Sequence, residues 1–86
     1  MEEEQINQIS KILTEWNPLG EDSKNIPDLD HYRTEAIDIL CQIEIQKKNL
    51  DIMKITKCII EEAFTISIAK KECIIPAQKI REVVNK

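Results

Sequence analysis

Residues 3–20 read Glu-Glu-Gln-Ile-Asn-Gln-Ile-Ser-Lys-Ile-Leu-Thr-Glu-Trp-Asn-Pro-Leu-Gly, and their pattern decides the fold class. Apolar side chains recur every three or four residues, which places them on one face of an α-helix. These residues are Ile6, Ile9, Ile12, Leu13 and Trp16. Asn17 precedes Pro18, and a residue before proline is pushed out of the helical region. We therefore predict a helix over residues 3–16, whose acidic start suits the positive end of the helix dipole.

The next segment, residues 17–30, is the longest loop that the sequence predicts. It contains Pro18, Pro27 and the sole glycine, Gly20. We expect Gly20 to adopt a positive φ, because glycine has no Cβ to clash there. Three apolar side chains are expected to attach part of the loop to the core: Leu19, Ile26 and Leu29.

A second helix is predicted over residues 31–46, with Asp30 as its N-cap. One apolar stripe consists of Tyr32, Ala36, Ile39, Leu40 and Ile43. Another stripe, on a different side, consists of Ile37, Cys41 and Ile45. An apolar arc this wide predicts burial on two sides. The helix is therefore either central to the fold or shared with a second subunit, and in the latter case the second stripe is the dimer face.

A third helix is predicted over residues 50–66, with Asn49 as its cap and about half of its circumference buried. Its first stripe consists of Ile52, Ile55, Ile59, Ala63 and Ile66. An adjacent stripe consists of Met53, Ile60 and Phe64.

The C-terminal segment favours a fourth helix over residues 70–84. Its apolar stripe consists of Cys73, Ala77, Ile80 and Val84. Pro76 should kink this helix or mark its true start. The alternative is a hairpin of residues 64–69 and 72–75, but its Lys70-Lys71 turn lacks the Asn or Gly of tight turns. The sequence thus predicts an all-α protein, an irregular array of about four helices, in a single domain of residues 1–86.

Composition narrows the function classes. The chain has 86 residues and a net charge of −4, with scattered lysines and three aromatic residues, so we expect no nucleic-acid partner. No apolar run approaches the ~18 residues of a membrane helix, so we expect no membrane partner. The Met-Glu-Glu-Glu start lacks the basic and apolar regions of a signal peptide, which predicts a cytoplasmic location.

No set of residues indicates catalysis, a metal or a cofactor. The chain has an odd number of cysteines, and none of them forms a C-x-x-C pair: Cys41, Cys58 and Cys73. With the single His31, they lack the closely spaced ligand pairs of a zinc site. Cys41 lies ~15 Å along the helix from His31, too far for direct proton transfer. One glycine excludes a phosphate-binding glycine loop. We therefore expect no catalytic residues, no metal and no cofactor.

One local group of residues stands out around the end of the first helix. It consists of Trp16, Asn17, Pro18, Leu19 and Gly20, followed by Tyr32, Glu35 and Asp38. Our first interpretation is structural: Trp16 anchors the loop, Asn17 braces the turn, and the two carboxylates bond loop amides. The second is a partner-binding surface, because Trp and Tyr are favoured interface residues.

These residues resemble the YugE-like family, small uncharacterised proteins of Bacillus-type bacteria with a domain of unknown function. The family pattern has a first helix ending in Glu-Trp-Asp/Asn-Pro-Leu/Ile-Gly, matched by residues 15–20. A Tyr-x-x-Glu-x-x-Asp-Ile block follows, matched by residues 32–39. Three later positions also match: Phe64, Cys73 and Ala77. The likeness spans about residues 9–84.

The chain departs from the family pattern at Asn17, where Asp is commoner, in a longer loop after Gly20, and at Pro76. The resemblance implies an irregular array of about four helices and no activity.

Our leading functional hypothesis is a non-catalytic protein-interaction or regulatory module, with an immunity-like or inhibitor protein as its specific version. The second is a structural homodimer through Ile37, Cys41 and Ile45. The third is an enzyme or small-molecule-binding protein with a pocket formed by Trp16, Tyr32, Glu35 and Asp38.

Overall fold

The computed structural model describes residues 3–20, 30–46 and 51–85. Within these ranges the chain forms α1 (Glu3–Trp16), α2 (Arg33–Ile45), α3 (Ile52–Phe64) and α4 (Lys70–Val84), and the short 3-10 turn η2 (Asp30–Tyr32) precedes α2. None of the described residues forms a strand. The predicted all-α class with four helices is confirmed, as are the predicted bounds of the first and last helices. The hairpin alternative is wrong, because α4 begins where the hairpin would turn.

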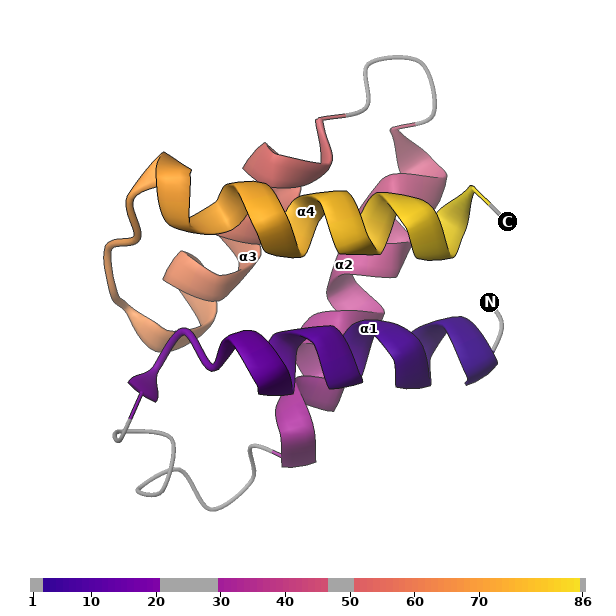
Figure 1. Ribbon diagram of the computed structural model, residues 1–86, viewed down its shortest axis with the longest axis horizontal. Helices are drawn as coiled ribbons and strands as arrows, with labels where there is room; N and C mark the ends of the chain where they lie inside the picture. The colour runs from indigo at the N-terminus through magenta and orange to yellow at the C-terminus, as the bar shows by residue number, and fades with distance from the viewer. Residues whose placement is uncertain (1–2, 21–29, 47–50, 86) are drawn as a thin grey trace.

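The four helices form a closed ring of contacts. α1 packs against α2 and α4, and α3 packs against the same two helices. Figure 1 shows α1 and α4 antiparallel and side by side in one layer, with α2 and α3 behind them. The core is therefore enclosed between two pairs of helices, and the seam between α1 and α4 lies on an open face of the molecule.

The core is built almost entirely from aliphatic side chains. Fully buried members come from all four helices, among them Ile9, Leu13, Ile39, Ile60 and Ile80. The predicted stripes of α1 and the first stripe of α2 lie in or against this core. On α3 the stripe is narrower than predicted, because Ala63 is exposed and the helix ends before Ile66.

The starts of α2 and α3 differ from the prediction. α2 has Tyr32 rather than Asp30 at its N-cap position, and no side chain caps it. The reason is that His31 and Tyr32 both adopt positive φ, so the regular helix starts only at Arg33. α3 is capped by Asp51 rather than Asn49: its carboxylate accepts the Lys54 N–H at 3.1 Å.

Pro76 lies inside α4, so the expectation that it marks the helix start is wrong. The first two turns of α4 are held by tertiary packing, because Cys73 and Pro76 are both buried. The helix thus tolerates the missing proline N–H, whose loss alone would disfavour a proline in a helix interior.

The connection from α3 to α4 is organised by Glu61. Its carboxylate accepts the backbone N–H of Ile68 at 2.8 Å and pairs with Lys57 at 2.9 Å. These bonds lower the pKa of Glu61, first through the Ile68 N–H and then through Lys57. Thr65, which ends α3 at a φ of 53°, turns the chain into this connection.

Candidate functional site

A tight turn closes α1. The Gly20 N–H donates to the Asn17 carbonyl at 2.9 Å, and the Asn17 side-chain amide donates to the Gly20 carbonyl at 3.1 Å. Gly20 has a φ of +61°, as predicted. No atom of the described residues lies within 4 Å of a Cβ added at Gly20, so the positive φ of its backbone is the reason that favours glycine there.

Tyr32 joins this turn to the start of α2. Its hydroxyl donates to Asn17 Oδ1 at 2.8 Å and accepts the Leu19 N–H at 3.4 Å. Its ring is 1% exposed and meets Phe64 edge-to-face, with ring centroids 5.9 Å apart. Tyr32 is therefore a buried cross-link between the end of α1, the start of α2 and the end of α3.

The backbone beneath Tyr32 is held by α1. The Ser10 hydroxyl donates to the His31 carbonyl. The Thr14 hydroxyl, one helical turn along α1, lies 2.8 Å from the Ser10 carbonyl and 3.1 Å from the His31 carbonyl, so its proton is shared between these two acceptors. His31 and Tyr32 have φ values of 56° and 60°, a region that costs residues other than glycine about 1–2 kcal/mol each. We call this set of contacts the Tyr32 brace, comprising Ser10, Thr14, Asn17, His31 and Tyr32.

The two carboxylates predicted beside Tyr32 differ in environment. Asp38 is exposed, whereas Glu35 is 7% exposed. Burial raises the pKa of Glu35, a bond to its own backbone N–H opposes this shift, and the nearby Asp38 adds to it. The predicted bonds from these carboxylates to amides of the 17–30 loop stay a prediction, because residues 21–29, including Ile26 and Leu29, lie outside the described residues.

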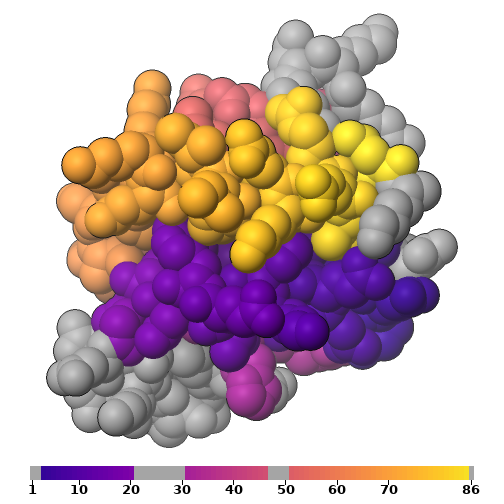
Figure 2. Space-filling view, in the orientation of Figure 1, coloured from indigo at the N-terminus to yellow at the C-terminus, as the bar shows by residue number. Residues whose placement is uncertain are grey.

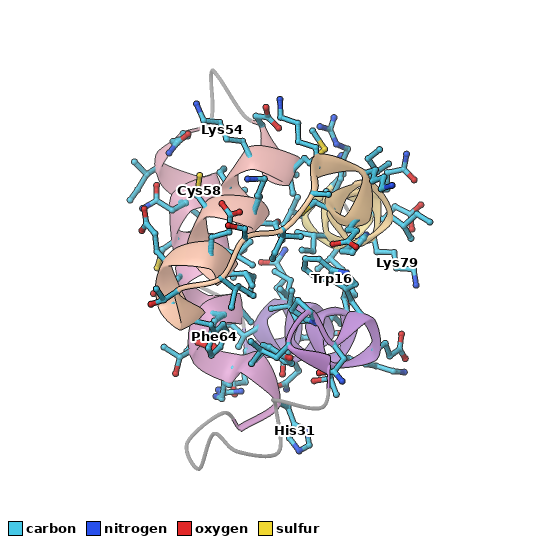
Figure 3. The ribbon with its side chains drawn as sticks, turned by 90° about the vertical axis from the view of Figure 1, so that its left-hand side faces the viewer. Trp16, His31, Lys54, Cys58, Phe64 and Lys79 are labelled. Carbon is cyan, nitrogen blue, oxygen red and sulfur yellow. The ribbon has the colours of Figure 1, made fainter. Side chains whose placement is uncertain are left out.

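Trp16 belongs to a different feature, a groove between α1 and α4. Figure 2 shows the two helices side by side along one face, and the groove lies where α1 ends and α4 begins. Its volume is about 500 Å³. Figure 3 shows Trp16 between the ribbons of α1 and α4, with Lys79 projecting outward from α4. The apolar part of the lining consists of Ile12, Trp16, Pro18, Ile75 and Pro76.

The groove also carries charges that form no ion pair with the residues that the structure describes. The charged lining residues are Glu15, Lys71, Glu72 and Lys79. The ion pairs among the described residues are Arg33–Glu3 and Lys57–Glu61, so none involves the groove. Ile75 is 62% exposed, and it is the one groove residue among the three large apolar side chains that are exposed in the described part of the chain, the others being Ile45 and Ile74. We define the α1/α4 groove by these nine residues together with Asn17, whose side chain serves the brace.

The predicted group around Trp16 therefore separates into two features. Asn17 and Tyr32 belong to the brace and bond to Gly20 and Leu19, whereas Trp16 and Pro18 line the groove. The lining of the groove does not include Tyr32, Glu35 or Asp38, so the structure does not unite these residues with Trp16 in one pocket.

Sequence reasoning missed the contribution of α4. Lys71, Ile75 and Lys79 follow one another at four-residue spacing, which marks one line along a helix. Ile75 is the apolar residue on that otherwise polar line, and an apolar residue on a polar helix face is the signal that could have indicated this surface.

The predicted dimer face is less exposed than a free interface would be. Ile37 and Cys41 are half-buried, and Ile37 packs against the core. Ile45 alone of the three is widely exposed, at 74%. A second groove of about 590 Å³ lies between α2 and α3, and its lining combines polar side chains such as Gln42, Gln46 and Lys54 with the apolar Ile55 and Ile59.

The three cysteines do not share an environment: Cys58 is exposed, Cys41 half-buried and Cys73 buried. Burial raises the pKa of the Cys73 thiol. In the part of the chain that the structure describes, no three His, Cys, Asp or Glu side chains gather as ligands for a metal ion. No described helix is long and apolar enough to cross a membrane.

Comparison of the chain with known protein families, curated proteins and solved structures finds no match. The resemblance to the YugE-like family therefore stays a prediction, and the functional argument depends on the α1/α4 groove.

Proposed function

We propose that this protein is a non-catalytic, cytoplasmic protein-interaction module of the regulatory or inhibitor kind, and that it binds its partner in the α1/α4 groove. The supporting observation is Ile75, a 62% exposed apolar side chain beside the half-buried Trp16. Covering apolar surface is the main favourable term in protein association, and Trp is a frequent anchor of interfaces. The proposed resemblance to the YugE-like family adds no activity.

The second candidate is a homodimer through Ile37, Cys41 and Ile45. The exposure of Ile45, at 74%, is the observation that favours it. Because most of this face is already half-buried against the protein's own core, a dimer formed there would cover little further apolar surface.

Two matched substitutions separate these candidates. Ile75→Asp and Ile45→Asp each place a charge on an exposed isoleucine, one in the groove and one on the α2 face. Tagged wild type and both variants would be used to capture partners from a lysate of the native host, after circular dichroism and urea unfolding have shown that they fold.

We expect a stoichiometric protein partner with wild type and Ile45→Asp, and its loss with Ile75→Asp. A partner retained by Ile75→Asp would show that the groove is not the binding face. Light scattering on the same three proteins tests the second candidate: a dimer of wild type that Ile45→Asp alone converts to a monomer would replace the first proposal with the second.

A further inference from the structure

The α4 wall of the groove has a regular chemical pattern. Lys71, Ile75 and Lys79 lie on one line of the helix, because residues four apart share a face. The two lysines are exposed and form no ion pair among the described residues. Their separation along the helix axis is about 12 Å, since each residue adds about 1.5 Å. An apolar side chain is thus flanked on both sides by an available positive charge.

We propose that the groove binds an amphipathic α-helix of another protein. This helix presents one large apolar side chain to Trp16 and Ile75, with a carboxylate four residues before it and another four residues after it. The proposal rests on the proposed function and specifies the chemistry of the partner. An aligned helix has the same rise per residue as α4, so carboxylates eight residues apart match the separation of Lys71 and Lys79.

The same pattern disfavours a second copy of this chain as the occupant. A symmetric antiparallel pair of α4 helices centred on Ile75 would place Lys71 of each copy opposite Lys79 of the other. Like charges at such positions repel. A partner helix with a carboxylate at each of these positions converts both contacts to attraction.

The acidic residues of the groove orient the partner. Glu15 comes from α1, and Glu72 comes from α4, four residues before the buried Pro76; both glutamates are exposed. Glu15 repels a carboxylate directed toward α1, whereas Lys71 and Lys79 attract one on the α4 side. This difference fixes the face that the partner helix presents.

The test uses two fluorescein-labelled synthetic helical peptides in an alanine and glutamine background. One carries Glu-x-x-x-Leu-x-x-x-Glu on one face, and the other carries Lys in place of both Glu residues. Binding is measured by fluorescence anisotropy at low ionic strength, where exposed charges are least screened. The proteins are wild type, Ile75→Asp, Lys71→Glu/Lys79→Glu and the control Lys11→Glu/Lys70→Glu. The control has the same change in net charge, and its two lysines are exposed outside the groove lining.

We expect wild type and the control to bind the Glu peptide about tenfold more tightly than the Lys peptide, as two exposed ion pairs allow. Lys71→Glu/Lys79→Glu should reverse this preference, and Ile75→Asp should abolish binding of both peptides. No binding to wild type, equal affinity for the two peptides, or a preference that the groove reversal leaves unchanged would each overturn the inference.

Capture from the host lysate separates failure of this inference from failure of the proposed function. A native partner that is lost with Ile75→Asp but retained by Lys71→Glu/Lys79→Glu would preserve the proposed function and overturn the acidic-helix inference. A native partner that Ile75→Asp retains would overturn both. A native partner lost with both groove variants and retained by Lys11→Glu/Lys70→Glu supports both.

Discussion

The Tyr32 brace and the α1/α4 groove meet at consecutive residues, yet they are built in opposite ways. In the brace, the Tyr32 hydroxyl, the Asn17 side chain and the His31 carbonyl all have hydrogen-bond partners. In the groove, a large apolar side chain is exposed and the charges have no ion-pair partner among the described residues. One region satisfies its groups internally, and the other leaves them available to a second molecule.

This difference shows how one helix end can serve two purposes. Trp16 is the last residue of α1, and Asn17 follows it at a φ of 49°. The change of backbone direction sends the Asn17 side chain to Tyr32, while Trp16 stays against α4. The brace thus fixes the end of α1, and a fixed helix end gives the groove a defined shape.

The largest expected effect is the loss of stability on removing the Tyr32 ring. Tyr32→Ala should lower the free energy of unfolding by about 3–5 kcal/mol, as for other large buried aromatic side chains. Ile75→Ala should change it by no more than about 0.5 kcal/mol, because Ile75 is mostly exposed. Urea unfolding followed by circular dichroism measures both.

Tyr32→Phe provides the graded control, since total loss of folding in Tyr32→Ala would hide the size of the effect. It keeps the ring contact with Phe64 and removes the hydroxyl that bonds Asn17 and Leu19. We expect a loss of about 1 kcal/mol. A phenylalanine variant as stable as wild type would show that the hydroxyl bonds contribute nothing to the brace.

A smaller effect is expected at Thr56, which contrasts with the brace inside the core. Its side chain is fully buried, and its Oγ1 has no hydrogen-bond partner in the described part of the chain. Thr56→Val replaces the hydroxyl by a methyl group and should raise the free energy of unfolding by about 1 kcal/mol.

Thr56→Ser is the matched control, because it keeps the hydroxyl and removes the methyl group. It should lower the free energy of unfolding by about 1 kcal/mol, the contribution of one buried methyl group. If valine destabilises the protein as well, the Thr56 hydroxyl has a buried hydrogen-bond partner, as the polar groups of the brace do.

The parts of the fold that could be predicted are those set by local pattern. The bounds of α1 and α4 follow from apolar periodicity, and Pro18 marks the end of α1. The start of α2 could not be found in this way. His31 and Tyr32 adopt a costly backbone conformation that Ser10 and Thr14 support from another helix, a tertiary contact with no local signal.

For the same reason, the sequence indicated the α1 side of the candidate site but not the α4 side. Trp16 and Pro18 stood out because an aromatic residue and a proline mark a helix end. Ile75 and its flanking lysines come into view only when α4 packs beside α1. The sequence placed Glu35 correctly on the second helix, but its burial depends on how that helix packs.

The finest comparison is between Glu35, beside the brace, and Glu61, in the α3–α4 connection, because their pKa values shift in opposite directions. Burial raises the Glu35 pKa above its ordinary value of 4.5, so folding favours the protonated form. The stabilising effect of this group is present below the unfolded pKa and is lost as the pH rises through the folded value. Glu35→Gln should therefore be more stable than wild type at neutral pH, with an advantage that shrinks in acid.

Glu61 should behave in the opposite way. The Ile68 N–H and Lys57 lower its pKa, so its contribution is present above 4.5 and is lost as the pH falls through the folded value. Glu61→Gln should be less stable than wild type at neutral pH, with a deficit that shrinks in acid. Urea unfolding of both variants at neutral pH and well below pH 4.5 measures these differences. Differences of the same sign at neutral pH would contradict the assignment, because burial and hydrogen bonding act on a carboxylate in opposite senses.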